Sequence, residues 1–274
     1  MAATEREPPS SIEASNANRP QMFHRISDNA IDESSDADSD FVKLQKTISK
    51  ERREARESPQ ARLQRAFPFT FHPNIRPLSK SDYESCIALE NAAFPDPAHR
   101  ATPEKASSPW PNMGHLGVFC TVVPEKAKNW TIETLDTAKP VETDRPNGAK
   151  SVLVAHIVST RCAGDTITDK DMDYPKDWRT RRGRSADVGH QEGGRTVAMH
   201  SLAVAPKLHG CGIGQMIVKA YLQQLKNAGL ADRVALICQD YLVSYYERLG
   251  FKCIGKSPAE FGGGGWHDMV SHDP

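Results

Sequence analysis

The sequence predicts an α/β fold, because strand-like and helix-like segments alternate in its C-terminal third. An apolar run at residues 199–204 is typical of a buried strand, and Pro206 interrupts it. A glycine-rich loop follows and leads into an amphipathic helix, which Gly229 ends. A second apolar run at residues 234–238 predicts another strand, and the helix after it closes at Gly250. This alternation indicates a sheet with helical connections.

The glycine-rich loop is the most informative segment of the chain. It reads His209-Gly210-Cys211-Gly212-Ile213-Gly214, and Gln215 follows it. Because glycine has no side chain, backbone N–H groups can face outward there, and the positive end of the next helix dipole favours an anion. The loop therefore suits a phosphate or pyrophosphate group. A glycine-rich turn without a ligand is the alternative.

Two common phosphate-binding loops do not fit this pattern. A Walker loop needs Lys followed by Ser or Thr after its last glycine, whereas Gly214 is followed by Gln215 and Met216. A dinucleotide-binding fold needs an acidic residue at the end of its second strand, whereas Asp232 precedes the next strand here. The pattern Gln/Arg-x-x-Gly-x-Gly/Ala of an acetyl-CoA pyrophosphate loop fits, except that His209 occupies its first position.

Residues 197–251 resemble the arylalkylamine (serotonin) N-acetyltransferases of the GNAT superfamily and their fungal relatives. The segments that carry the resemblance are residues 200–204, the glycine loop, residues 238–251 and, upstream, residues 75–82, 89–95 and 114–119. The upstream segments are similar to the first strand, first helix and second strand of that family. The resemblance covers roughly residues 68–270 with gaps, and it implies a mixed, mainly antiparallel sheet of about six or seven strands flanked by helices.

The resemblance also implies a role for individual residues. The backbone of Leu202, Ala203 and Val204 would bind the pantetheine arm and the acetyl group of acetyl-CoA, and residues 209–215 would bind its pyrophosphate. Tyr246 would donate a proton to the departing thiolate, and His200 would help to carry protons away from the amine. The candidate substrate-binding residues are Phe94, Met199 and Ile237. Packing in the core is the alternative for both Tyr246 and His200.

The chemistry of amine acetylation explains why such groups are needed. An alkylammonium group has a pKa of about 10, so it must lose a proton before it attacks a thioester. Direct attack then needs alignment but no covalent enzyme intermediate. A backbone N–H stabilises the tetrahedral oxyanion best, and Val204 is the candidate.

The group that removes the proton is open. Animal members of the family carry two histidines around this strand, but the residue two positions before His200 is Ala198. The candidate carboxylates are Glu90 and Asp96, which flank a Phe-Pro segment expected near the amine, and His156 and His190 rank behind them.

The N-terminal part of the chain differs from the rest in composition. Residues 27–40 contain six acidic residues and four serines but no Lys or Arg. Such a segment cannot bury enough apolar surface to offset its ordering entropy, so we expect a disordered tail over residues 1–66, with at most one marginal helix after residue 40. The tail would serve as a docking site for a regulatory protein or as a solvated spacer. We expect the acetyltransferase domain at residues 67–274, with loop insertions near 126–150 and 165–194.

Composition limits the classes of partner. The 274 residues include 35 basic and 35 acidic residues, so nothing favours a nucleic-acid partner. There is no apolar run of about 18 residues and no hydrophobic signal segment, so we expect a cytoplasmic protein that does not bind a membrane, and a monomer. Six scattered cysteines without metal-type spacing predict free thiols and no metal.

The expected substrate is a primary amine, with acetyl-CoA as cosubstrate. Arylalkylamines such as serotonin, tryptamine or phenethylamine come first, and polyamines are the alternative. A non-catalytic acyl-CoA-binding protein and a peptide N-acetyltransferase are the more distant alternatives.

Overall fold

The computed structural model describes residues 42–49, 57–100, 115–177, 179–180 and 187–272. The chain divides into two compact units, Met1–Ala55 and Arg56–Pro274. In the first unit, residues 42–49 form a helix, whereas the acidic segment at residues 27–40 lies outside the described residues. Helix α2 (Pro59–Ala66) belongs to the second unit, although the sequence assigned these residues to the tail. The boundary thus falls before α2 and not after it.

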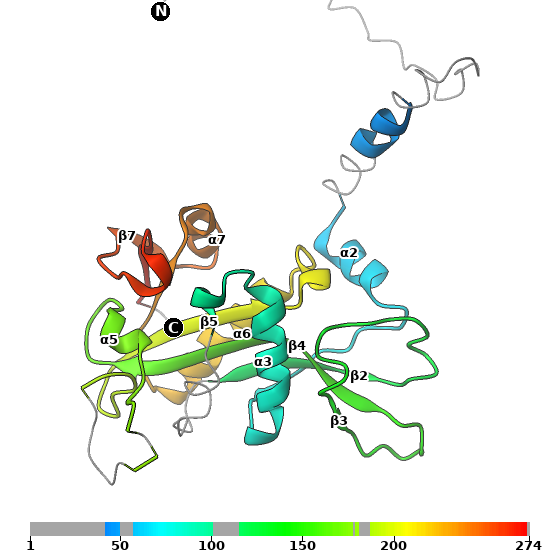
Figure 1. Cartoon of the computed structure of the whole chain (residues 1–274), viewed down its shortest axis with the longest axis horizontal. Helices are drawn as coiled ribbons and strands as arrows, with labels where there is room; N and C mark the ends of the chain where they lie inside the picture. The colour runs from blue at the N-terminus through cyan, green and yellow to red at the C-terminus, as the bar shows by residue number, and fades with distance from the viewer. Residues whose placement is uncertain (1–41, 50–56, 101–114, 178, 181–186, 273–274) are drawn as a thin grey trace, which may run out of the picture. The chain divides into compact units, whose positions relative to one another are not determined.

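The second unit contains an eight-stranded sheet with the order β1-β2-β4-β5-β6-β8-β7, in which β3 also pairs with β4 (Figure 1). The strands are β1 (Asn74–Pro77), β2 (Leu116–Val122), β3 (Lys139–Pro140), β4 (Lys150–Cys162), β5 (Thr196–Val204), β6 (Arg233–Cys238), β7 (Lys252–Lys256) and β8 (His267–Ser271). Among the described strands, β5 and β6 are the one pair that runs in parallel. The expected mixed, mainly antiparallel sheet is therefore confirmed, and the two-residue β3 accounts for the additional strand.

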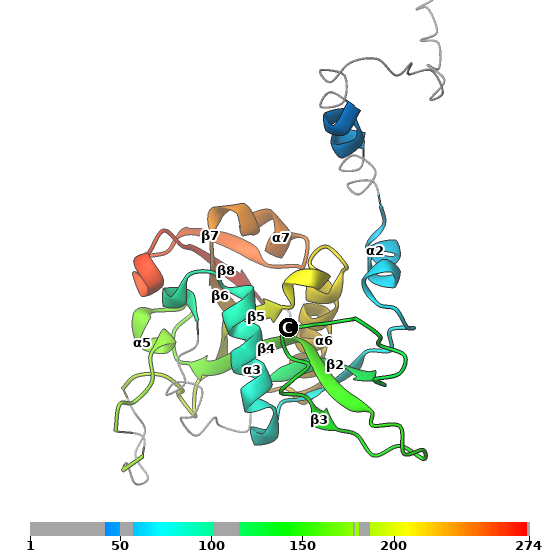
Figure 2. The same cartoon turned by 45° about the vertical axis from the view of Figure 1, so that its right-hand side comes forward.

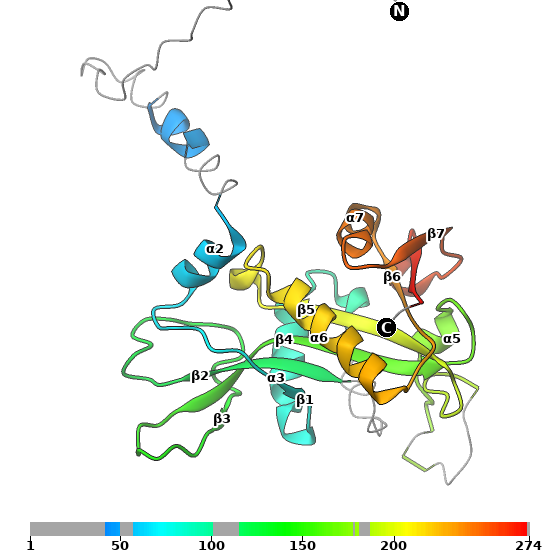
Figure 3. The same ribbon diagram turned by 180° about the vertical axis from the view of Figure 1, so that it is seen from behind.

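Helices lie on both faces of this sheet. They are α3 (Tyr83–Ala93), α5 (Asp169–Met172), α6 (Ile213–Ala228) and α7 (Val243–Glu247), with short 3₁₀ turns η1 (Lys80–Asp82), η2 (Pro97–His99), η3 (Pro206–Leu208), η4 (Asp240–Leu242) and η5 (Phe261–Gly263). Helix α3 crosses β4 and β5 on one face, and α6 covers the same strands on the other (Figures 1 and 3). Helix α7 packs against β7 and β8 (Figure 2).

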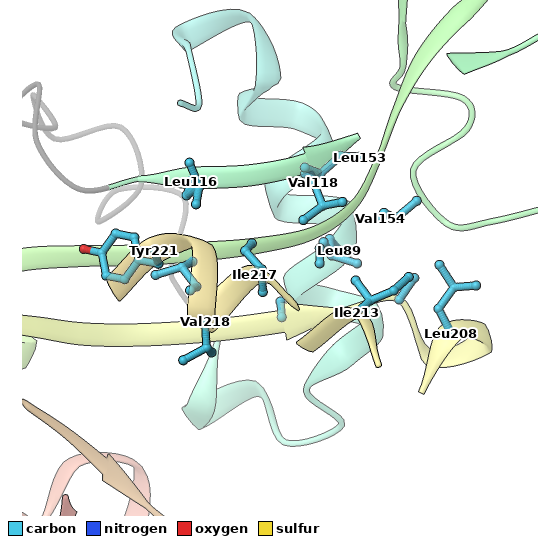
Figure 4. Close-up of a cluster of buried hydrophobic side chains, with 14 of the residues drawn as sticks. Leu89, Leu116, Val118, Leu153, Val154, Leu208, Ile213, Ile217, Val218 and Tyr221 are labelled. Atoms are coloured by element: carbon cyan, nitrogen blue, oxygen red, sulfur yellow. The ribbon is translucent and has the colours of Figure 1, made fainter. Parts of the chain in front are cut away.

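Helix α6 is fixed by its apolar side and by its two glycine ends. Ile213, Ile217 and Tyr221 recur every fourth residue, and all three are buried in the main core (Figure 4). Burial of each isoleucine side chain contributes about 1.5–3 kcal/mol. At the C-terminal end, Gly229 adopts φ +60° and its N–H bonds to the carbonyls of the last turn. At its other end, α6 begins at Ile213, directly after the N-cap residue Gly212 of the glycine loop.

Strand β5 contains a bulge at His200. Val158 of β4 pairs with Ser201, but the next residue, Ser159, pairs with Met199. His200 is therefore one extra residue on β5, which leaves the ladder and bends the strand. The parallel pairing of β5 with β6 ends close to this point, at Ala198.

Candidate active site

The two parallel strands separate after the bulge and leave the second half of β5 without a partner in β6. Ala205 donates its N–H to Val154 of β4 at 3.0 Å. Successive residues of a strand point their N–H groups to opposite sides, so the Val204 N–H points toward the opened β6 side. The Val204 carbonyl points the same way, because it lies 2.9 Å from His209 Nε2. This arrangement supports the backbone N–H that the sequence assigned to the oxyanion.

The glycine loop lies at the N-terminus of α6, where the first helical N–H groups have no partner within the helix. Gly212 is the N-cap and adopts φ +81°, a left-handed conformation that favours glycine. A Cβ on Gly214 would lie 2.8 Å from the Tyr245 hydroxyl and 3.6 Å from a Val204 methyl group. A side chain at residue 214 would therefore press against Tyr245 and Val204, and the unpaired N–H groups of the first helical turn suit a bound pyrophosphate.

Tyr246 lies on the α6 side of the sheet, in α7, and only 7% of it is exposed. Its ring makes edge contacts with Tyr245 (5.1 Å) and Phe251 (5.6 Å). Burial raises the pKa of Tyr246 above its ordinary value, so the phenol stays protonated at neutral pH. Burial also raises the pKa of Tyr245. The phenol is thus in the protonated form that a general acid needs, while the same raised pKa makes it a weaker acid than a free phenol.

His200 lies on the opposite face, the one that α3 covers. Its Nε2 is 2.7 Å from the Thr160 hydroxyl on β4. Because the bulge takes His200 out of the regular ladder, the imidazole and Thr160 meet across the two strands. The structure thus gives His200 a hydroxyl partner on the neighbouring strand.

Three buried polar side chains meet beneath α3. Glu90 Oε1 lies 2.7 Å from His156 Nε2 and also accepts a hydrogen bond from the Ser201 hydroxyl. His156 is fully buried on β4, and Glu90 is 3% exposed. Burial opposes the charged form of His156, but hydrogen bonds to Cys86 and Glu90 outweigh it and raise the pKa of His156. The structure therefore joins two candidates that are far apart in the sequence into one buried acid–base group.

Two further candidates lie outside this group. The Asp96 carboxylate accepts the Ala98 N–H at 2.9 Å and caps the exposed turn η2. His190 Nδ1 accepts the Arg161 N–H near the end of β4. Both side chains have local structural roles.

The three expected substrate-binding residues do not share one surface. Phe94 caps the end of α3 and packs against the main core. Met199 lies opposite Ser159, whose hydroxyl bonds to Tyr221 of α6, so Met199 is on the α6 face and 4% exposed. Ile237 packs against a smaller cluster on the α3 face. The sequence could not show that these residues lie on different faces of the sheet, because the bulge at His200 changes which residues of β5 face α3.

Asp268 is a residue that the sequence reasoning missed. It lies on β8 directly opposite Ile237, with 6% of it exposed. Its Oδ1 is buried and has no hydrogen-bond partner among the residues that the structure describes. A buried carboxylate oxygen without a hydrogen bond is costly, so this position suits a cationic or hydrogen-bond-donating ligand. The signal in the sequence was an acidic residue inside an apolar strand.

The aromatic residue Trp266 lies two positions before Asp268, directly before β8. Trp266 donates its indole N–H to the Phe261 carbonyl at 2.6 Å and packs edge-on against His99 at 5.1 Å. His99 Nε2 lies 3.0 Å from the Gly262 carbonyl, and Asp169 accepts the N–H of Phe261 at 2.8 Å. The segment that contains the glycine run at residues 262–265 thus contacts both α5 and η2.

Comparison with known proteins agrees with this geometry. Residues 150–272 match the family model described as the acetyltransferase (GNAT) domain. This match and the relatives below confirm the resemblance to the GNAT acetyltransferases that the sequence predicted.

The more specific relatives match a short stretch. The serotonin N-acetyltransferases of Mesocricetus auratus and Homo sapiens are 38% and 36% identical to this chain over 66 residues, which are 24% of this chain and 32% of each relative. The chain thus spans about a third of the length of the curated relatives it matches.

Solved structures with a similar arrangement have low sequence identity. The loading GNATL domain of CurA from Lyngbya majuscula has a TM-score of 0.46 and 15% identity, over 74% of this chain and 98% of that domain. The PaiA N-acetyltransferase from Thermoplasma acidophilum in complex with coenzyme A has a TM-score of 0.40 and 14% identity, over 73% and 99%.

The described residues contain no group of three or more His, Cys, Asp or Glu side chains arranged to hold a metal ion. Within the same residues, no helix has the length and hydropathy needed to cross a bilayer. All six cysteines are free.

Proposed function

We propose that this chain transfers the acetyl group of acetyl-CoA to a primary amine, and that arylalkylamines are its first substrate class. The observation that carries the proposal is the opening between β5 and β6 that follows the bulge at His200. The glycine loop lies beyond the end of this opening, Tyr246 lies on its α6 side, and the polar side chains of Glu90 and His200 lie on its α3 side.

The residues on the α6 side would bind the cosubstrate and complete the transfer. Acetyl-CoA supplies an activated acyl group as a thioester. The loop N–H groups would hold the pyrophosphate, and the Val204 N–H would stabilise negative charge on the carbonyl oxygen. Tyr246 would donate its proton to the thiolate sulfur, which its raised pKa permits because the phenol is still protonated at neutral pH.

The residues on the α3 side would remove the proton from the ammonium group. His200 with Thr160 is one route, and Glu90 with Ser201 and His156 is the other. Ser201 is adjacent to His200 in β5, so both routes begin at the bulge. A proton that reaches Glu90 would be shared with His156 inside the domain.

Two observations bear on the kind of amine. The short match to serotonin N-acetyltransferases and the aromatic pair His99–Trp266 support an arylalkylamine. The buried Asp268 supports the alternative, a polyamine, because its carboxylate would pair with a second ammonium group.

The test is acetyl-CoA-dependent thiol release with serotonin, tryptamine, phenethylamine, spermidine and spermine side by side. Turnover concentrated on the aromatic amines is the expected result. Turnover confined to spermidine and spermine would replace the proposal with the polyamine alternative. If acetyl-CoA binds but none of the five amines reacts, peptide substrates or a non-catalytic acyl-CoA-binding role would replace it.

A further inference from the structure

We propose that Arg62 of α2 binds a phosphate group of CoA beside the glycine loop, so that the helix before the first strand is part of the cofactor site. The proposal rests on the function proposed above, in which this loop holds the CoA phosphates. Neither the loop pattern nor the GNAT match reaches residue 62, since the matched segment begins at residue 150.

The first turn of α2 lies against the loop. A Cβ on Gly210 would lie 2.7 Å from the Nη1 of Arg62 and 3.8 Å from its Cζ. A Cβ on Gly212 would lie 3.4 Å from the Cβ of Pro59. The guanidinium group is therefore within contact distance of the backbone that would cradle the pyrophosphate. Figure 1 shows α2 beside the segment that contains η3 and the loop, and α2 contacts η3.

Tertiary contacts hold α2 in this position. Trp130 donates its indole N–H to the carbonyl of Ala66 at 2.9 Å. Phe67, the residue after the helix, packs against Trp130 with 5.2 Å between the ring centroids, and Leu63 packs against the main core. An arginine on a helix that is docked in this way is oriented before a ligand binds, so little further ordering entropy is lost on binding.

The charges around the loop favour an anion. Burial, the largest influence, raises the pKa of the Cys211 thiol, and the positive charges of Arg62 and Arg65 oppose this rise. Glu57 has the opposite effect and forms an ion pair with Arg65 at 2.8 Å. Lys207 extends away, to the carbonyl of Thr131 at 3.1 Å. Among the described residues, the Arg62 guanidinium is the side chain nearest to the Cβ position of Gly210, and a guanidinium can bind a phosphate through two parallel N–H bonds.

The experiment compares Arg62→Gln with Arg65→Gln in the full chain. Both changes remove one positive charge from the same helix, but the Arg65 side chain is 59% exposed and paired with Glu57. Calorimetry would measure the affinity for CoA and for 3′-dephospho-CoA, and thermal unfolding without ligand would check the fold. R62Q should weaken CoA binding by about tenfold to a hundredfold, whereas R65Q should change it by less than about twofold.

The dephosphorylated ligand identifies which phosphate is bound. A defect of R62Q that disappears with 3′-dephospho-CoA assigns Arg62 to the 3′-phosphate, and a defect that persists assigns it to the pyrophosphate; both support the proposal. Equal CoA affinity of R62Q and wild type would overturn it. Tighter binding by R62Q would also overturn it and would indicate that α2 covers the loop. If the wild-type protein binds no CoA, the proposed function fails together with this assignment.

Discussion

Replacement of Tyr246 by Phe removes one buried hydroxyl and leaves the ring in place. The ring keeps its edge contacts with Tyr245 and Phe251, which are worth about 0.5–1.5 kcal/mol each, so the free energy of unfolding should change by less than about 1 kcal/mol. A general acid contributes about a hundredfold to ten-thousandfold in rate. We therefore expect kcat to fall at least about a hundredfold, which corresponds to about 2.7 kcal/mol of transition-state stabilisation. The KM for acetyl-CoA should stay within about twofold, because this hydroxyl acts on the departing sulfur.

The assay is steady-state thiol release from pH 6 to 9, with chemical denaturation as a control for folding. Burial keeps the Tyr246 phenol protonated across this range, so the wild-type enzyme should lose no activity through this group on the alkaline side. Tyr245→Phe is the matched control, because it deletes the same atom at the next residue, where the hydroxyl faces Gly214. Wild-type kcat for Y246F at every pH, or a rate defect confined to Y245F, would refute the acid role of Tyr246.

Three other changes test the loop, the buried pair and the acceptor side. Gly214→Val should abolish acetyl-CoA binding in calorimetry, whereas Gly229→Ala at the other end of α6 should only lower stability, because nothing lies within 4 Å of its Cβ position; wild-type affinity of G214V would contradict the loop assignment. Glu90→Gln should destabilise the fold by about 3 kcal/mol near pH 6, since it leaves His156 buried without its carboxylate. In wild type, the raised pKa of His156 gives stability that is fully present below about pH 6.5 and lost as the pH rises through the folded-state value, so denaturant unfolding should show this decline in wild type and not in E90Q. Asp268→Asn should raise the KM for spermidine and spermine about tenfold with equal or higher stability, because it removes a buried carboxylate that has no partner for Oδ1 among the described residues; an unchanged KM for these polyamines would exclude a substrate contact.

Local patterns predicted the elements of the site well. The period of α6, its end at Gly229 and the loop before Ile213 all follow from side-chain spacing and from the conformations that glycine permits. Such features depend on residues that are close in the sequence. The sequence could therefore place the loop and Tyr246 on the right elements.

Contacts between distant segments were harder to predict. Glu90 and His156 meet because α3 packs across β4, a pairing that 66 residues of separation conceal. The position of Met199 on the α6 face depends on the register of two strands, and the docking of α2 depends on Trp130. Composition assigned α2 to a disordered tail, because a short basic helix has few apolar residues of its own and gains its order from the surface that receives it.

The bulge at His200 decides which side chains of β5 face α3, and it does so because β5 has one residue more than the facing part of β4. Before the bulge, the even-numbered residue Ala198 faces α3. After the bulge, the odd-numbered residues Ser201 and Ala203 face α3, because one extra residue shifts the alternation of side chains by one position. In an unbroken ladder, Ser201 would turn toward α6 and Glu90 would lose its hydroxyl donor. Deletion of His200 would remove the bulge and leave Met199 opposite Ser159 and Ser201 opposite Val158, so the following side chains would keep their faces but β5 would lose its bend.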